Sequence, residues 1–375
     1  MPNKFFLFFF IMVQSSLSSA QELSTAIDLY NKGIEYFNAK NYEMALATYT
    51  RCIEKDPTFT KAYYNRGNCR INQKDFKGAL EDFNKTIKLD PAFTKAYLFK
   101  GYTYLLMNDY SNCILTLTDA LDKDRSLSKA YVHRGTAYMK TGKFDMAIND
   151  FTKAITEGEQ HYAVYLNRGI CKAKMEDFQG ALADMNAASD INPNQSNSSA
   201  EKSKIYLKLE KWNEAIAEIT NALKKNPSDA DLYHNRGFAK LMMEDFNGAF
   251  LDFSICIQIN PDHDNALRNK AITSYKLGKF EEAAKDYSRL INKDPQNAEL
   301  YMHRGTCYLE LKEYDTSLKD FSEAIRYKSD FAEAYFNRAN AYTKLLDIKN
   351  ACKDIKESAK LGYLPAQANV NNICN

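Results

Sequence analysis

Small and apolar side chains recur along this chain at helical spacing, and the pattern begins anew twice in every 34 residues. In the segment Ala230 to Pro261 the side chains that define the two helical faces are Tyr233, Gly237 and Lys240, then Ala249, Phe253 and Cys256. Each triplet lies at i, i+4 and i+7, which predicts two amphipathic helices per segment. A polar turn separates them, and Asn-Pro ends the second helix, because proline disfavours helical backbone before it and cannot donate within a helix.

The same pattern recurs at a fixed step through the chain. Small residues stand every 34 residues at Gly33, Gly67, Gly101, Gly135, Gly169, Ser203, Gly237, Ala271, Gly305 and Ala339. Prolines keep the same step at Pro57, Pro91, Pro193, Pro227, Pro261 and Pro295. We number positions within a repeat so that the small residue is position 8, which places the start of repeat one at Ala26 and of repeat ten at Ala332. A period of about 20 to 50 residues predicts a stacked array of supersecondary units.

Position 8 predicts a close approach of the two helices in each pair. Glycine lowers helix stability by about 1 kcal/mol relative to alanine, and helix axes approach to about 8 to 10 Å when the contact residues are small. Position 20 is also small in all ten repeats, and position 17 is aromatic in nine, as expected for a ring that fills the elbow between the helices.

The repeat resembles the tetratricopeptide repeat, which has an aromatic at position 4, Gly at 8, Tyr at 11, Ala at 20, an aromatic at 24, Ala at 27 and Pro at 32. Repeat four matches all of these except the proline, with Tyr131, Gly135, Tyr138, Ala147, Phe151 and Ala154. The resemblance covers residues 26 to about 358. It implies an all-α fold, a right-handed α-solenoid of about ten helix-turn-helix repeats with a C-terminal capping helix, in a protein of the exported bacterial type.

The pattern divides the chain into four segments. Residues 1–20 lie before the array, 21–193 hold repeats one to five, 194–358 hold repeats six to ten, and 359–375 form the cap. Repeat six departs most from the pattern, with Ser203 for Gly and Ile219 for the aromatic. The polar run before it predicts a softer joint at 194–202.

The N-terminal segment predicts export. Lys4 precedes the apolar run Phe5 to Val13, and Ser18-Ser19-Ala20 forms a small-residue cleavage site, as in a secretory signal peptide. The run is shorter than the roughly 20 residues that a membrane-spanning helix needs, and an uncleaved anchor is the alternative. Because no cysteine follows the predicted cut, a lipoprotein is disfavoured. We expect a periplasmic, cell-surface or secreted protein.

Charge argues against polyanionic partners. The chain has 50 Lys and Arg against 48 Asp and Glu, and loss of residues 1–20 removes only Lys4 from that balance. This gives no net field toward nucleic acid or an anionic membrane. We expect no nucleic-acid partner, and membrane association only through a partner or an uncleaved signal segment.

The eight cysteines fall into two groups. Six occupy helix positions at which small buried side chains fit, which predicts core residues: Cys52, Cys69, Cys113, Cys171, Cys256 and Cys307. Cys352 and Cys374 lie outside that pattern and bracket the C-terminal tail. We predict a disulfide between them that clamps a last helix, Ala366 to Ile373, as a cap; a loop of this size would stabilise the fold by about 3 kcal/mol.

No pattern for catalysis, a cofactor or a metal is present. The five histidines form no HExxH pair, and the sequence has no GxSxG, phosphate loop or CxxC. The repeated glycines are predicted within helices, so they form no phosphate-binding loop. We therefore expect no enzymatic activity, no cofactor and no bound metal.

One charge pair recurs between positions 7 and 23. Six repeats combine Arg with Asp: Arg66 with Asp82, Arg134 with Asp150, Arg168 with Asp184, Arg236 with Asp252, Arg304 with Asp320, and Arg338 with Asp354. Where position 23 is neutral, at Thr48 and Thr116, position 7 is lysine. This covariation predicts a partly buried bidentate ion pair between helices, within a repeat or across a repeat boundary. Two independent solvated charges are the alternative.

Position 6 holds the strongest candidate for binding. By resemblance it faces the concave groove, where asparagines hold the backbone of an extended peptide, and here it carries Asn31, Asn65, His133, Asn167, Asn235, Asn269, His303 and Asn337, with Phe99 and Glu201 in the other repeats. The equally weighted alternative is that asparagine is simply usual in this repeat subtype. Position 2, also groove-facing by resemblance, adds Lys61, Lys95 and Lys129 in the first half and Asp231 in the second. The carboxylate clamp of some co-chaperones in the family finds only two of five matches, so its ligand is not supported.

We therefore predict a non-catalytic scaffold that binds a protein or an extended peptide in the concave groove. The alternative is a structural subunit of an envelope or secretion complex that assembles through its convex face and its ends. An enzyme or carbohydrate-binding activity on the repeat fold is a third and weaker hypothesis.

Overall fold

The structure, a computed structural model, describes residues 25–374 and divides by its contacts into two compact units, Met1–Ile191 and Asn192–Asn375. Each unit is described by itself. The predicted signal peptide lies outside the described residues. The softer joint at 194–202 stays a prediction.

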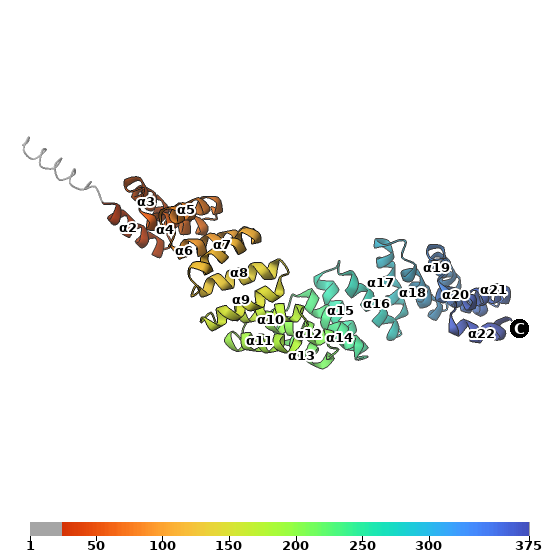
Figure 1. Ribbon diagram of the computed structural model, residues 1–375. Coiled ribbons are helices and arrows are strands. Elements are labelled where there is room, and N and C mark those ends of the chain that lie inside the picture. Colours follow the sequence, from red (N-terminus) through yellow and green to blue (C-terminus); the bar gives the residue numbers. More distant parts are fainter. Residues whose placement is uncertain (1–24, 375) are drawn as a thin grey trace, which may run out of the picture. The chain divides into compact units, whose positions relative to one another are not determined.

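The first unit holds five consecutive helix pairs, stacked in chain order (Figure 1). They are α2 (Ala26–Asn38) with α3 (Tyr42–Lys55), α4 (Thr60–Asn72) with α5 (Phe76–Leu89), α6 (Thr94–Leu106) with α7 (Tyr110–Lys123), α8 (Ser128–Lys140) with α9 (Phe144–Thr156), and α10 (Tyr162–Lys174) with α11 (Phe178–Ile191).

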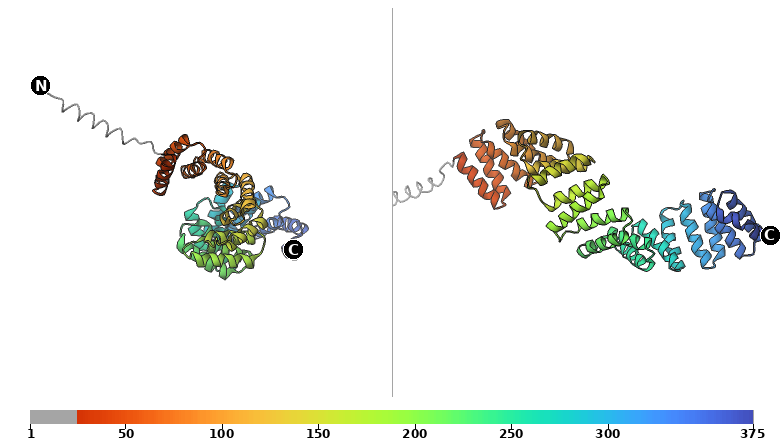
Figure 2. Two further views of the ribbon diagram at one scale, coloured as in Figure 1. Left: turned by 60° about the vertical axis from the view of Figure 1, so that its left-hand side comes forward. Right: turned by 60° about the horizontal axis from the view of Figure 1, so that its bottom comes forward.

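The second unit repeats this arrangement and ends in a single helix; two further views show the same pairwise stacking (Figure 2). Its pairs are α12 (Asn197–Lys208) with α13 (Trp212–Lys225), α14 (Ala230–Met242) with α15 (Phe246–Ile259), α16 (Asp264–Lys276) with α17 (Phe280–Lys293), α18 (Ala298–Glu310) with α19 (Tyr314–Tyr327), and α20 (Ala332–Lys344) with α21 (Ile348–Lys360); α22 (Leu364–Cys374) follows. Residues 25–374 contain no strand. The predicted all-α solenoid of ten helix pairs with a C-terminal helix is confirmed.

Within each unit the first helices of successive pairs also contact one another, as α4 does α6, α6 does α8 and α18 does α20. Elements on the inner side of a curved stack lie closer together than those on its outer side. The first helices therefore form the inner face of each unit and the second helices the outer face.

The predicted close approach at position 8 is confirmed. A Cβ placed on Gly237 would lie 2.8 Å from Cε1 of Phe253, the position-24 ring of the same pair, and Phe253 is fully buried. Gly67 and Gly305 meet Phe83 and Phe321 in the same way. Interiors are packed too closely for such a ring to move aside, so position 8 stays small.

The turn inside each pair uses a backbone conformation that the sequence did not indicate. Position 15 has positive φ in all ten repeats, although it is glycine only at Gly142 and Gly278; the others are Lys40, Lys74, Asn108, Glu176, Glu210, Glu244, Lys312 and Leu346. The following N–H donates to the carbonyl of position 11, as Asp245 does to Lys240 at 2.9 Å. This is the helix-ending motif that usually selects glycine, and here the packed pair holds other residues in it.

The Arg–Asp pairs lie within a repeat and also reach the repeat before. Nε and Nη2 of Arg236 donate to the two carboxylate oxygens of Asp252 at 2.9 and 2.7 Å, and Nη1 donates to Oγ1 of Thr220 on the preceding second helix at 3.3 Å. We call this arrangement the arginine clasp. It recurs as Arg66, Asp82 and Thr50; Arg134, Asp150 and Thr118; Arg168, Asp184 and Thr152; Arg304, Asp320 and Ser288; and Arg338, Asp354 and Ser322.

A second cation joins the clasp in three repeats, which sequence reasoning missed. Position 11 carries a basic residue there, and Lys240 lies 2.8 Å from Oδ2 of Asp252. Arg70 and Lys172 do the same for Asp82 and Asp184. Lys240 is therefore part of the interior charge network rather than a solvated surface residue.

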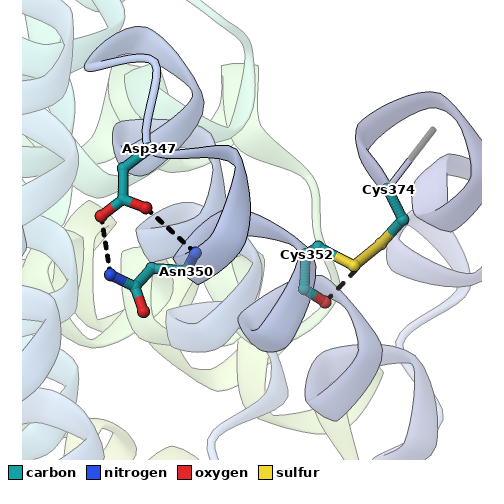
Figure 3. Close-up of a disulfide and its surroundings, with 4 residues drawn as sticks. All are labelled: Asp347, Asn350, Cys352 and Cys374. Atoms are coloured by element: carbon teal, nitrogen blue, oxygen red, sulfur yellow. Dashed lines mark hydrogen bonds between the residues drawn. A yellow bond between two sulfur atoms is a disulfide. The ribbon is translucent and has the colours of Figure 1, made fainter.

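The C-terminal helix is a cap held by a disulfide. Cys352 on α21 is bonded to Cys374 at the end of α22, with their Cα atoms 4.9 Å apart (Figure 3). Ala366 is buried in a cluster with Ala339 and Ile355. At the start of α21, Asp347 accepts hydrogen bonds from the backbone and side-chain nitrogens of Asn350 (Figure 3). The predicted disulfide and capping helix are confirmed.

Arg236→Ala should lower the free energy of unfolding by about 2 to 4 kcal/mol, because it leaves the buried Asp252 carboxylate without its bidentate partner. Arg236→Lys should lower the free energy of unfolding by less than Arg236→Ala does, since lysine cannot donate two parallel hydrogen bonds to the carboxylate as arginine does. Urea titration followed by circular dichroism measures both. Arg289→Ala is the matched control, because Arg289 is exposed and 3.9 Å from Asp286, and it should change stability by less than about 1 kcal/mol. Equal effects of Arg236→Ala and Arg289→Ala would contradict the clasp.

Replacing both Cys352 and Cys374 by serine should loosen α22 by about 3 kcal/mol, because the bond no longer restricts the unfolded tail. Hydrogen exchange should accelerate in residues 364–374 and stay unchanged in α2 to α5. If both cysteines of the unfolded wild-type chain can be alkylated without reductant, the bond is absent.

Candidate functional site

Cavities open on the inner faces of the two units, and three of them are lined by position-6 residues and built by successive repeats. One of about 360 Å³ in the second unit takes residues from three repeats, among them Tyr275, Met302 and Asn337. Two of about 350 Å³ each in the first unit adjoin, because Leu98, Phe99 and Lys129 line both. The residues that line these three cavities come mainly from positions 2, 5, 6, 9 and 13, which identifies the inner surface as the candidate site.

Position 6 lies on this surface and also joins neighbouring repeats. Nδ2 of Asn65 donates to the Tyr30 hydroxyl at 3.1 Å, and Nδ2 of Asn269 lies 3.3 Å from Nε2 of His234. Both partners stand at position 5 of the repeat before. Asn337 approaches Met302 Sδ in the same direction. These asparagines have a structural role between repeats, whereas ligand binding by the row stays a prediction.

The remaining residues of the row differ in surroundings. Asn31 is exposed, and Asn167 is half-buried. Asn235 Oδ1 lies 3.4 Å from Nδ1 of its neighbour His234. His133 lies against Tyr102 with ring centroids 4.7 Å apart, and His303 is stacked on the buried ring of Tyr287 at 5.5 Å.

The charged residues of position 2 that were predicted as site residues are exposed. Lys61, Lys95 and Lys129 are exposed, and Lys95 and Lys129 line the cavities of the first unit. Asp231 is exposed and lies 3.3 Å from Nε2 of His263. The charge of this position therefore differs between the two units.

Aromatic rings form a continuous run along the inner face of the first unit. Phe99 meets Tyr64 edge to face at 5.7 Å and Tyr102 at 6.5 Å, and Tyr102 contacts His133. The run exists because repeats three and four carry Phe99 and His133 where most repeats have asparagine. Such edge-to-face packing fixes the rings in place.

One buried carboxylate borders this run. Glu159 accepts hydrogen bonds from the Ser128 hydroxyl at 2.8 Å and from Nε2 of His161 at 2.6 Å. Burial opposes its ionisation, but the two hydrogen bonds outweigh burial and lower the pKa of the Glu159 carboxyl. Burial, aided by the Lys129 charge, lowers the pKa of His133 to about 4, so its imidazole is neutral near pH 7.

The free cysteines in the described part of the chain lie in the interior. All six cysteines predicted as core residues are buried, and burial raises the thiol pKa to about 11 for Cys52 and Cys256 and about 12 for the rest. Thiols in this state are poor nucleophiles. Between residues 25 and 374 no group of three or more His, Cys, Asp or Glu could hold a metal ion, and no helix there is long and apolar enough to span a bilayer.

These features define a helical repeat protein whose inner face is the candidate site. Family models of the tetratricopeptide repeat match residues 26–59, 60–93, 128–157, 268–330 and 332–361, and a TPR repeat model matches residues 204–243. The chain belongs to the tetratricopeptide repeat proteins. This repeat serves in general as a protein-interaction scaffold and is typically non-catalytic. No curated protein matches the chain.

Three solved structures are similar to this chain, and the first agrees with the fold. The C-terminal part of a TPR repeat-containing protein from Cytophaga hutchinsonii is 14% identical, covers 64% of this chain and 98% of its own, and superposes with a TM-score of 0.55. YrrB, described as a TPR protein with an unusual peptide-binding site, is 23% identical over 50% of this chain and 97% of its own, with a TM-score of 0.46. Yeast Tom70 is 16% identical over 93% of this chain and 95% of its own, with a TM-score of 0.38.

Sequence reasoning missed much of the cavity lining. Leu98 and Val132 in the first unit and Tyr275 and Met302 in the second were not predicted as site residues. A signal existed for the first unit, since Phe99 and His133 interrupt the asparagine row at adjacent repeats.

His133→Asn should remove a pH dependence of stability. The folded pKa of about 4 lies below the ordinary value of 6.5, so unfolding takes up a proton below pH 6.5. Stability is therefore full above pH 6.5 and declines as the pH falls toward 4. Relative to the variant, the native chain should lose about 2 kcal/mol between pH 7 and pH 5, as measured by urea unfolding at each pH. Parallel profiles for the two proteins would contradict the burial of a neutral imidazole.

Proposed function

We propose that this protein is a non-catalytic scaffold that binds a protein or an extended peptide along the inner face of its first helices. The observation that carries the proposal is the series of inner-face cavities, each assembled from two or three successive repeats. Cavities with an apolar floor and a few polar groups suit side chains of a bound segment. Their spacing along stacked repeats suits an extended ligand rather than a single small molecule.

We further propose that the protein acts after export, in the periplasm, at the cell surface or as a secreted protein. The signal-like N-terminal segment supports this, and so does the Cys352–Cys374 disulfide, because disulfides persist in oxidising compartments.

The second candidate is a structural subunit that assembles through the outer face. It is supported by Leu115 and Leu251, which are 62% and 58% exposed on α7 and α15. Both stand at position 22, opposite the buried positions 20, 24 and 27 of the second helix. Large exposed apolar side chains at an equivalent position of two repeats suit an assembly contact.

Photo-crosslinking separates the two candidates. A benzophenone amino acid is placed singly at Lys129 and Lys276 on the inner face and, as matched outer positions, at Leu115 and Leu251. Mature protein, residues 21–375, is irradiated in envelope extract. The scaffold proposal expects discrete crosslinked partners from the inner positions only. Crosslinks from the outer positions alone would overturn it and favour the structural subunit.

A further inference from the structure

The inner face of the first unit has a one-sided charge. At positions 2, 6, 9 and 13 of repeats one to five the ionisable side chains that carry charge near pH 7 are all lysines: Lys61, Lys95, Lys129, Lys140 and Lys174. The same positions of repeats six to ten mix lysines with the carboxylates Glu201, Asp231, Glu299, Glu310 and Glu333. The inner face therefore carries charge of one sign in the first unit and charges of both signs in the second.

The lysines stand beside the aromatic run rather than apart from it. The cavity between repeats two and four is lined by Tyr64, Leu98 and Phe99 with both Lys95 and Lys129. The adjoining cavity adds Tyr102 and Val132 behind Lys129. Each lysine is exposed, and within the described residues neither Lys95 nor Lys129 has a carboxylate within salt-bridge distance.

The acid nearest to this surface does not compensate both lysines. Glu159 is buried, and its two oxygens accept from Ser128 and His161. Its charge acts on Lys129 across the second cavity, but Glu159 does not line the cavity that contains Lys95. A ligand carboxylate is therefore attracted most strongly between Lys95 and Lys129.

We propose that this surface binds an acidic protein segment that inserts two large apolar side chains into the adjoining cavities. The surface consists of the rings of Tyr64, Phe99, Tyr102 and His133 together with Lys95 and Lys129. The inference rests on the proposed scaffold function and names its partner class. The two cavities fix two apolar anchors, and the lysines select Asp or Glu beside those anchors. Complementary charge around an apolar contact gives specificity and faster association more than it gives affinity.

A protein segment fits this surface better than a single-stranded nucleic acid. Bases bind by stacking on open ring faces, whereas Phe99 packs edge to face against Tyr64 and Tyr102, at interplanar angles of 84° and 87°. Arginine, which nucleic-acid surfaces favour for phosphate contacts, is missing from the inner positions of repeats one to five.

The test selects ligands from a phage-displayed library of random 12-residue peptides on the mature chain, residues 21–375. We expect one enriched group that combines Asp or Glu with two large apolar residues. Its synthetic consensus peptide should lose affinity at least tenfold on Lys95→Glu with Lys129→Glu, measured by fluorescence polarisation. A peptide in which lysine replaces the acids should regain binding to that charge-reversed variant. Added salt should weaken the native complex, because the lysines remain exposed to solvent.

Two variants guard the interpretation. Lys77→Glu with Lys153→Glu makes the same charge change at exposed lysines of the second helices α5 and α9, and it should leave the affinity unchanged. Phe99→Asn restores the asparagine that six repeats carry at position 6, and it should weaken the acidic peptide at least fivefold while helicity, checked by circular dichroism, is retained.

Three outcomes would overturn the proposal. One is the absence of an acidic and apolar group among the selected peptides, and another is an acidic group whose binding survives Lys95→Glu with Lys129→Glu. The third is tighter binding of oligo(dT) than of the consensus peptide, lost in the same charge-reversed variant, which would identify a nucleic-acid surface. If either of the first two results is found together with crosslinks from the inner face, the scaffold function still holds, and only the proposal of an acidic partner is wrong.

Discussion

The distance between the two helices of a pair depends on one contact, that of a small residue at position 8 with the large side chain at position 24. Gly67, Gly237 and Gly305 each leave room for a phenylalanine ring that would otherwise collide with a Cβ. Positions 7 and 23, which carry the arginine clasp, are the immediate neighbours of these two positions. Because the ring packs beside glycine, the guanidinium at position 7 and the carboxylate at position 23 lie within hydrogen-bond distance of each other. Two of the three departures follow this constraint, since Ser203 and Ala339 are larger than glycine and are paired with the smaller Ile219 and Ile355 at position 24, whereas Ala271 is paired with Tyr287.

The arginine clasp extends this local contact to the preceding repeat at six boundaries between repeats. Each guanidinium is bonded to a carboxylate in its own repeat and to a hydroxyl in the repeat before, as Arg304 is to Asp320 and Ser288. A buried carboxylate without its cation would be strongly unfavourable, so a repeat that separates from its neighbour loses part of what keeps its own pair together. Stability in such arrays comes from nearest-neighbour interfaces, and here the same arginine serves both the pair and the interface.

The sequence predicted what depends on the period alone. The helix pairs, the close approach at Gly237 and the Arg236–Asp252 pair all follow from residue type at a repeated position, and the Cys352–Cys374 bond was predicted because these two cysteines lie outside the pattern. What it did not predict depends on how one repeat meets the next. The bond from Asn269 to His234 joins residues 35 apart, and the cavity lining at Val132 exists only once two first helices lie side by side.

Local conformational preference misled in one further place. Leu346 and Glu244 have positive φ at position 15, where residue type alone would favour glycine. The packed pair overrides this preference, because the turn must close between helices whose distance is already fixed. The sequence placed the candidate site on the inner face, which stays a prediction, whereas the full lining of its cavities could be assigned only from the contacts between repeats.

The arginine clasp has a consequence for how such a chain can change in length. Every clasp joins position 7 to position 23 of its own repeat and to position 25 of the repeat before. A segment of 34 residues can therefore be removed or duplicated between equivalent points of repeats with complete clasps, such as those of Arg134 and Arg168. Every arginine then still meets an aspartate and a hydroxyl. The 34-residue step is thus a unit of inheritance as well as of structure. Unequal recombination within the gene would yield folded proteins of different length, and the inner surface could be lengthened or shortened without redesign of its interior.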